Sequence, residues 1–130
     1  MSRARLPGDR TVGGPVSYQL LIELKRPAAI RIGALGRHRF PAGLYVYTGS
    51  ARRNMEARLC RHRSRAKTLR WHIDYFLAHP ASHLVGIERS AIPECALNQQ
   101  TRGEVIVRGF GSSDCRAGCD SHLLFMGTLS

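Results

Sequence analysis

The sequence predicts a single mixed domain, α/β or α+β, built on a small central sheet. Apolar stretches typical of strands fill much of residues 17–47, and after residue 50 the pattern changes to the period of a helix. A length of 130 residues and a hydrophobic content of 43% are those of one domain with an ordinary core. We place this domain at residues 15–130 and expect the basic segment 1–14 to be a disordered arm.

The first half of the domain is predicted to be β-structure. Ser17–Leu24 is an apolar run between a Gly-Pro segment and Lys-Arg-Pro, and it predicts a strand. Residues 30–36 predict a short strand ending in a turn, residues 37–43 an edge segment and turn, and residues 44–47 a strand closed by Gly49 and Ser50. We expect these segments to form one antiparallel sheet with hairpin connections.

The second half alternates helices and short strands. Residues 51–66 predict a helix, and a second helix follows with Thr68 as its cap and Pro80 at its end. Pro93 predicts the first turn of a helix over residues 94–100. Strands are predicted at residues 84–88, 105–107 and 123–126, with a loop at residues 110–114.

The charge is strongly basic and unevenly distributed. The formal net charge is +11, and residues 1–70 contain 16 Lys or Arg against three Asp or Glu. Such a surface attracts polyanions, most commonly nucleic acids, although solubility alone is the alternative explanation. We expect phosphate contacts from the turn before the first helix and from the basic helix itself: Gly49, Ser50, Arg52, Arg53, Arg61, Arg65, Lys67 and Arg70.

The chain carries no sign of a membrane or secreted protein. It has no apolar run long enough to span a bilayer, and its basic N-terminus lacks the apolar core of a signal peptide. Four cysteines without a secretion signal favour free thiols and a cytoplasmic location. A domain of this size has little surface for base readout, so a homodimer or a protein partner is a further expectation.

Two tyrosines and a basic helix could carry chemistry. Tyr45 and Tyr47 share one face of a strand, which packing explains as well as function does. Tyr47 is followed by Thr48-Gly49 and a helix start, which suits a phosphate. Arg58, beside the buried helix stripe, could clamp a phosphate. His62, one turn later, could orient phosphate or relay a proton, or could simply be solvated.

Carboxylates and thiols suggest two kinds of metal site. Glu94 opens a helix, where it interacts well with the helix dipole but could also bind one Mg²⁺; Asp74 and Glu104 are rival carboxylates. Cys115, Cys119 and His122 form a C-x3-C-x2-H pattern that resembles part of a zinc site. Because a closed site needs a fourth ligand, which Cys60, His62 or Cys95 would have to supply, we favour packing or turn chemistry over zinc.

Together these segments resemble the GIY-YIG nuclease superfamily, and within it the Uri-type endonucleases, small stand-alone domains long carried as a family of unknown function. The resemblance runs from about residue 15 to residue 126. It rests on an ordered set of short motifs: Tyr18-Gln19-Leu20-Leu21, Gly43-Leu44-Tyr45-Val46-Tyr47-Thr48-Gly49-Ser50-Ala51, Arg58-Leu59-Cys60-Arg61-His62, Trp71-His72-Ile73-Asp74-Tyr75, Glu94-Cys95-Ala96-Leu97, Gly109-Phe110-Gly111-Ser112-Ser113-Asp114-Cys115 and Ser121-His122-Leu123.

The resemblance implies a sandwich-like α+β fold with a small, mainly antiparallel three-stranded central sheet flanked by helices. We expect extra C-terminal strands besides this sheet. It implies that the two signature tyrosines are Tyr18 and Tyr47 on neighbouring strands, so that Tyr45 packs nearby. Val16-Ser17-Tyr18 stands where the family has Gly-Ile-Tyr, and the connection between the two motifs is longer than usual.

The resemblance also implies the chemistry. Arg58 would stabilise phosphate charge, and Glu94 would bind a single Mg²⁺ or Mn²⁺. The expected activity is metal-dependent hydrolysis of phosphodiester bonds in DNA, with Tyr18 or Tyr47 acting on the attacking water and His62 sharing the proton traffic. Two alternatives stay open: a nucleic-acid-binding module of the same fold without cleavage, and a zinc-stabilised interaction domain.

Overall fold

The chain folds around one five-stranded sheet. The computed structural model describes residues 14–51, 53–64, 68–112 and 118–128. Every neighbouring pair in the sheet is antiparallel, and the strands lie in the order β5 (Ser82–Ser90), β1 (Ser17–Leu24), β4 (Gly43–Ser50), β7 (Leu123–Gly127) and β6 (Glu104–Val105).

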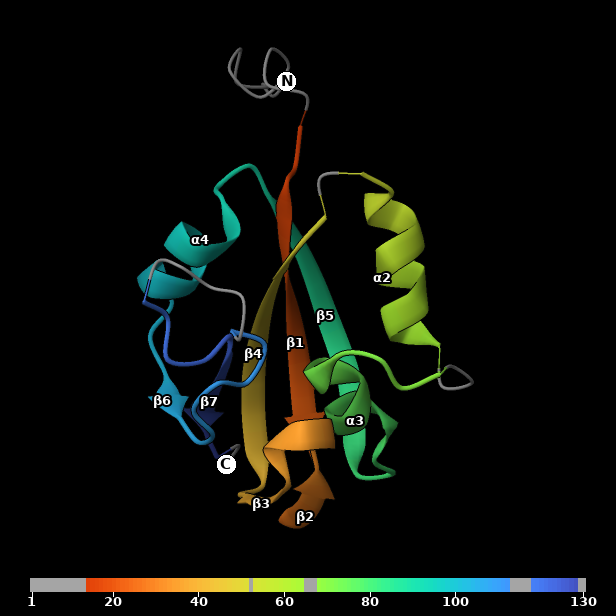
Figure 1. The fold of residues 1–130 in the computed structure, drawn as a ribbon, viewed down its shortest axis with the longest axis vertical. Coiled ribbons are helices and arrows are strands. Elements are labelled where there is room, and N and C mark those ends of the chain that lie inside the picture. The colour runs from red at the N-terminus through yellow and green to blue at the C-terminus, as the bar shows by residue number, and fades with distance from the viewer. Residues whose placement is uncertain (1–13, 52, 65–67, 113–117, 129–130) are drawn as a thin grey trace.

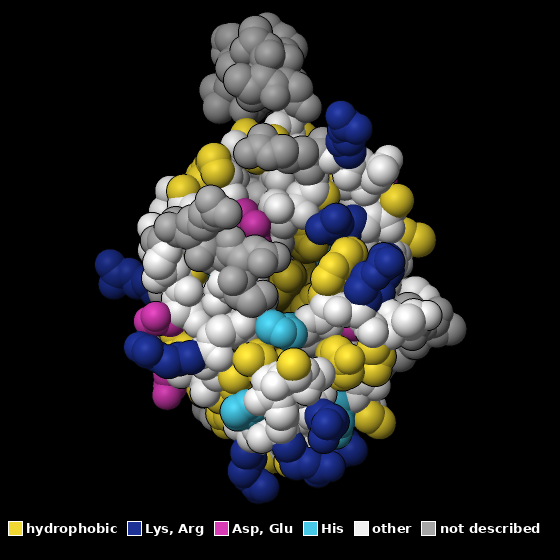
Figure 2. Space-filling model, in the orientation of Figure 1, with side chains coloured by type: hydrophobic (Ala, Val, Ile, Leu, Met, Phe, Trp, Pro, Cys, Tyr) yellow, Lys and Arg dark blue, Asp and Glu magenta, His cyan; other side chains and the backbone are white. Residues whose placement is uncertain are grey.

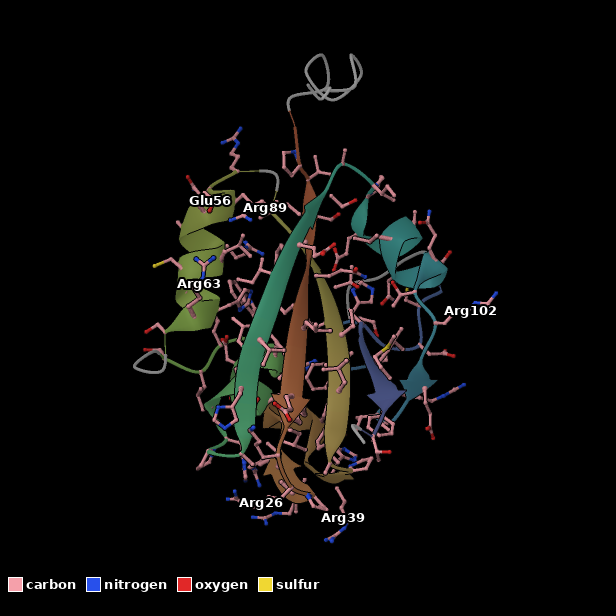
Figure 3. The ribbon with its side chains drawn as sticks, turned by 180° about the vertical axis from the view of Figure 1, so that it is seen from behind. Arg26, Arg39, Glu56, Arg63, Arg89 and Arg102 are labelled. Atoms are coloured by element: carbon pink, nitrogen blue, oxygen red, sulfur yellow. The ribbon has the colours of Figure 1, made fainter. Side chains whose placement is uncertain are left out.

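A second, smaller sheet and three helices complete the described part of the domain. β2 (Ala28–Arg31) and β3 (Arg37–Phe40) form a hairpin whose connection contains the short 3₁₀ helix η1 (Gly33–Leu35). The helices are α2 (Met55–Arg63), α3 (His72–Ala78) and α4 (Glu94–Gln100). In Figure 1, α2 and α3 lie on the β5 side and α4 on the opposite side. Seen from behind, β5, β1 and β4 are in front of α3 and the hairpin (Figure 3).

Alternation along β1 places its apolar side chains on one face of the sheet. Tyr18, Leu20, Ile22 and Leu24 are all 0–1% exposed, whereas the residues between them are half-buried. The buried face meets an aromatic cluster of Phe40, Tyr45, Phe76 and Phe110, whose neighbouring rings pack at centroid distances of 5.0 to 6.4 Å. This packing fixes the face on which Tyr18 and Tyr47 lie.

The predicted sheet is correct in class but wrong in detail. The α+β class and the antiparallel pairing are confirmed, but the central sheet has five strands rather than three. β7 pairs with the free edge of β4, and such pairing satisfies backbone groups that an edge strand would leave open. Segments 30–36 and 37–43 were also expected in the central sheet. Their strands β2 and β3 instead form the separate hairpin, and β1 pairs directly with β4.

The local predictions located β1 and α4 correctly but misplaced the starts of α2 and α3. β1 and α4 have the predicted bounds, but α2 begins at Met55 rather than at residue 51. Ala51 still continues the sheet, because its amide donates to the Val16 carbonyl at 3.0 Å, and Asn54 has a left-handed φ of 57° before the helix. Thr68 is not the cap of α3. The Asp74 carboxylate accepts the backbone amides of Trp71 and Arg70 at 2.8 and 2.9 Å, and the helix begins at His72.

Candidate active site

Tyr18 and Tyr47 lie on the same face of adjacent strands. In the β1–β4 register, Tyr18 is opposite Gly49 and Leu20 is opposite Tyr47, so the two tyrosines are diagonal neighbours. A Cβ on Gly49 would stand 2.5 Å from Cζ and Oη of Tyr18. Gly49 is therefore needed to leave room for the Tyr18 ring. It is buried inside β4, which differs from the phosphate-facing turn that the sequence suggests.

Four of the predicted catalytic side chains line one open pocket of about 250 Å³: Tyr18, Tyr47, Arg58 and Glu94. They come from β1, β4, α2 and α4, which are far apart in the sequence. Ser50, Arg70, Trp71, His72 and Gly111 complete the lining. Figure 2 shows a hollow near the middle of this face, with Lys and Arg side chains on one side and an acidic side chain on the other. Tyr45 is outside the pocket lining and packs against Phe76 and Phe125 with centroids 5.0 Å apart.

His62 lies behind Tyr18 rather than in this pocket. Its Nε2 is 2.7 Å from the Tyr18 hydroxyl, and only 3% of its surface is exposed. It also lines a second open cavity, of about 530 Å³, bordered by Arg63, Leu77, Arg89 and residues 82–87. His62 therefore lies between the Tyr18 hydroxyl and a separate cavity bordered by α2 and β5.

Burial keeps both tyrosine hydroxyls protonated. It raises the pKa of Tyr18 to about 12; the adjacent Arg58 guanidinium opposes this rise and Glu94 adds to it. Burial also raises the pKa of Tyr47, more strongly, with further contributions from Tyr18 and Glu94. Neither phenol is ionised near neutral pH, so a proton must leave Tyr18 as another arrives if this residue is to act as a base.

Arg58 is positioned by its neighbours to face the pocket. Its Nη1 donates to the Ser50 carbonyl at 2.8 Å, and its Cζ lies 4.6 Å from the centroid of the Trp71 ring. Cation–π stacking restricts the guanidinium while leaving further N–H groups able to donate to a ligand. An arginine held this way suits a phosphate oxygen.

Arg61 and Asp74 have a structural role instead. Arg61 donates to Asp74 at 2.8 Å and to the Thr68 carbonyl at 2.7 Å, while its Cζ lies 4.4 Å from the centroid of the Trp71 ring. Asp74 is fully buried; burial disfavours its ionised form, but Arg61 and the amides of Trp71 and Arg70 outweigh this and lower its pKa. Asp74 is thus a capping carboxylate that holds Trp71 beside Arg58.

Glu94 is the carboxylate that reaches the pocket. It is the first residue of α4, its side chain is 27% exposed, and its Oε2 lies 2.7 Å from Nδ1 of His122. One partly exposed carboxylate suits a Mg²⁺ or Mn²⁺ ion that keeps several waters. The rival Glu104 lies in β6, exposed, and is close enough to Tyr45 to help raise the pKa of that phenol.

The expected phosphate-binding residues do not all lie in one place. Ser50 and Arg70 line the pocket, Arg53 is exposed shortly before the start of α2, and Arg61 is paired with Asp74. Arg52, Arg65 and Lys67 lie outside the described residues. Other basic side chains gather at the hairpin end of the molecule, where Arg26 and Arg39 point outward (Figure 3); Arg31 and Arg37 are exposed there too.

Several residues around the pocket have no functional role in the prediction from sequence. Trp71 and His72 were noted only as part of a motif; the structure places Trp71 beside both Arg58 and Arg61, and His72 Nδ1 accepts the Gly111 amide at 2.8 Å. Burial lowers the pKa of His72, consistent with an acceptor nitrogen. The signal available beforehand was the combination of Trp and His at the start of an amphipathic helix.

Three sulfur and nitrogen ligands also lie together, next to Glu94. The ligand atoms of Cys95, Cys119 and His122 are all within 4.8 Å of one another. Of the fourth ligands considered from the sequence, Cys60 is exposed on α2 and His62 pairs with Tyr18. Cys115 lies outside the described residues.

Comparison with known proteins identifies a family but no activity. No curated protein and no solved structure gives a significant match to the chain. Within the described residues, no helix has the length and apolar character to cross a membrane. A model of one protein family matches residues 17–130, which include every residue of the pocket. The chain therefore belongs to the family described as domain of unknown function DUF123.

Proposed function

We propose that this protein is a divalent-metal-dependent endonuclease of the GIY-YIG type that hydrolyses phosphodiester bonds in DNA. The observation that carries the proposal is the convergence of Tyr18, Tyr47, Arg58 and Glu94, from four separate elements, on one pocket. Packing alone explains Tyr45, but it gives no reason for a cation and a carboxylate to face two tyrosine hydroxyls.

Arg58 is proposed to bind the scissile phosphate. Its guanidinium is oriented by Ser50 and Trp71 before any ligand arrives. Charge on the phosphate oxygens grows in the transition state, so a preoriented cation stabilises that state more than the bound substrate. Arg70, also in the pocket lining, adds positive charge for the neighbouring DNA backbone.

Glu94 is proposed to hold the metal ion. A Mg²⁺ or Mn²⁺ ion would supply Lewis-acid stabilisation of the phosphate and of the leaving oxygen. Contact with His122 through Oε2 orients the carboxylate and leaves its second oxygen chemically able to act as a ligand. Glu94 thus fits the single-carboxylate ligand that the resemblance to the GIY-YIG superfamily implies.

Tyr18 is the better of the two tyrosines as the residue that accepts a proton from water. Its hydroxyl passes its own proton to His62 Nε2, 2.7 Å away, as it takes one from the attacking water, so no free phenolate is required. Water oxygen bonds to phosphorus, the P–O3′ bond breaks, and the 3′ oxygen takes a proton from solvent. Tyr47, with its more strongly raised pKa, remains a hydrogen-bond donor that orients water or phosphate.

The test is DNA cleavage by the purified chain and by matched variants. Supercoiled plasmid, linear duplex and branched DNA would be incubated with Mg²⁺ or Mn²⁺. Glu94→Gln is expected to lower the cleavage rate by about 10²–10³-fold, as for other preorganised groups that act on transition-state charge. Glu104→Gln, which alters an exposed glutamate in β6, is the control and should cleave like the unmodified protein.

DNA binding measured in parallel separates this proposal from its main alternative. Binding with a steep salt dependence, but no cleavage of any substrate with either metal, would establish a nucleic-acid-binding module and refute the nuclease assignment. If Glu94→Gln cleaves DNA at the rate of the unmodified protein, the assignment of Glu94 as the metal ligand is wrong.

A further inference from the structure

A group of side chains that could bind a metal ion lies beside Glu94, and the proposed cleavage uses it only through the contact of His122 with that carboxylate. Cys95 is in the first turn of α4, whereas Cys119 and His122 precede β7. Their ligand atoms lie within 4.8 Å of one another, and Sγ of Cys95 is 4.0 Å from Nε2 of His122. Two thiols and one imidazole from segments more than 20 residues apart are the donors that zinc prefers.

The contacts of His122 determine which nitrogen carries its proton. Nδ1 lies 2.7 Å from Oε2 of Glu94 and 3.2 Å from the Thr48 carbonyl, and both of these oxygens are acceptors. Nδ1 must therefore donate, so in the neutral ring Nε2 holds a lone pair directed to the side where Cys95 lies. A histidine that ligates through one nitrogen and donates to a carboxylate through the other is the usual arrangement at zinc sites.

The ligand atoms, all within 4.8 Å of one another, need to move closer by about 1 Å at most to accept an ion. Bond lengths of about 2.3 Å to sulfur and about 2.0–2.1 Å to nitrogen place tetrahedral ligands about 3.6–3.8 Å apart. The observed 4.0 Å between Cys95 and His122 is close to this range. Cys95 and Cys119 are half-buried and His122 is 1% exposed, so the ligands are accessible to an ion but shielded from bulk solvent.

We propose that Cys95, Cys119 and His122 bind one Zn²⁺ ion, with water as its fourth ligand, distinct from the divalent ion assigned to Glu94. The ion would join the start of α4 to residues 118–122, which belong to no helix or strand. Because the Nδ1–H of His122 contacts the carboxylate of Glu94, the ion would also hold that carboxylate in position. Glu94 would then both line the pocket and hydrogen-bond a zinc ligand. The two metals differ in their ligands: thiolate and imidazole for zinc, oxygen for Mg²⁺ or Mn²⁺.

Zinc content of the full chain tests the proposal without any measurement of cleavage. Protein purified with a reductant would be loaded with Zn²⁺, dialysed, and analysed by mass spectrometry of the metal. About one equivalent is expected, and replacement by Co²⁺ should give the intense visible bands of a tetrahedral thiolate site. Cys95→Ser, Cys119→Ser and His122→Gln should each lose the metal and the bands, whereas Cys60→Ser, which alters an exposed thiol on α2, should keep both.

Two further measurements keep the test decisive even if a cysteine variant fails to fold. Glu94→Gln should retain the zinc but bind it about 10–100-fold more weakly, as expected when a histidine ligand loses its carboxylate partner. Folded unmodified protein that retains less than half an equivalent of zinc would overturn the proposal. So would a Cys95–Cys119 disulfide found by peptide mass analysis in protein that carries no zinc.

Discussion

The hydroxyl of Tyr18 lies 2.7 Å from Nε2 of His62, at the boundary between two cavities. Tyr18 lines the pocket that contains Arg58 and Glu94, and His62 lines the other cavity. A proton that moves from Tyr18 to His62 therefore leaves the pocket in which phosphate would bind. This separation favours proton release away from a negatively charged substrate.

Replacing Tyr18 by Phe should abolish most cleavage and also alter the response of stability to alkaline pH. An unfolded phenol ionises near its ordinary pKa of 10.0, but folding raises the pKa of Tyr18 to about 12. The resulting stability, about 2–3 kcal/mol, is present below pH 10 and is lost as the pH rises toward 12. The free energy of unfolding, measured with urea at pH 9 and at pH 11.5, should differ less between the two pH values for Tyr18→Phe than for the unmodified protein.

Tyr45→Phe is the matched control for this experiment. Burial raises the pKa of Tyr45 as well, so its alkaline response should also change, but its hydroxyl contacts the Pro41 carbonyl rather than the pocket. Cleavage by Tyr45→Phe should stay near the unmodified rate. Equal loss of cleavage in both variants would show that aromatic packing, not the Tyr18–His62 pair, is what matters.

Arg58→Lys should reduce the cleavage rate by about 10²-fold while changing DNA affinity little. Lysine keeps the charge but lacks the planar fork that stacks on Trp71 and can contact two phosphate oxygens. Single-turnover kinetics at saturating DNA would measure the chemical step separately from binding. Arg53→Lys, at an exposed position before α2, should have no comparable effect; if both variants behave alike, Arg58 acts only as part of the general basic surface.

Gly49→Ala should destabilise the fold by about 1–3 kcal/mol because the new methyl group overlaps the Tyr18 ring. Gly86→Ala in β5 is a suitable comparison, since a Cβ there would meet Leu21 at an ordinary contact distance of 3.5 Å. The free energy of unfolding of Gly86→Ala should differ from that of the unmodified protein by less than about 1 kcal/mol. Urea denaturation measures both, and equal changes in the two variants would argue against the Tyr18 clash.

Asp74→Asn should lower the free energy of unfolding by about 3 kcal/mol near neutral pH, since it removes the buried negative charge that pairs with Arg61. Folding lowers the pKa of Asp74, so its contribution is present above the ordinary pKa of 3.8 and is lost as the pH falls below it. The variant should therefore lose less stability in acid than the unmodified chain. Glu56→Gln breaks the exposed pair between Glu56 and Arg89 (Figure 3) and should have a much smaller effect.

Local sequence signals predicted some elements well. An apolar run between a Gly-Pro segment and Lys-Arg-Pro predicted the bounds of β1, and Pro93 predicted the start of α4 at Glu94. The start of α3 was missed because its cap is the Asp74 side chain reaching back to Trp71 and Arg70, and the Thr68 hydroxyl looked equally suitable in the sequence. Which side chain caps a helix depends on the tertiary contacts that orient it. Here Arg61 orients the Asp74 carboxylate.

Long-range pairing could not be predicted from the sequence alone. β7 pairs with β4 across more than 70 residues, and β2 leaves the central sheet to pair with β3. For the candidate site, the residues themselves suggested Tyr47, Arg58 and Glu94, and the family resemblance added Tyr18. The fold brings these four side chains to one pocket. The approach of Cys95 to Cys119 and His122 was not readable, because it depends on how α4 docks beside the segment before β7.

The contact between Gly49 and Tyr18 has a consequence for recognising distant relatives. The two residues are 31 positions apart, but each sets the space available to the other. In an aligned set of relatives the two positions should change together. An aromatic ring at the position of Tyr18 should require glycine at the position of Gly49, and loss of the ring should allow larger residues there. A search pattern that treats the two tyrosine motifs as one linked pair, with a connection of any length between them, should find relatives that either motif alone would miss.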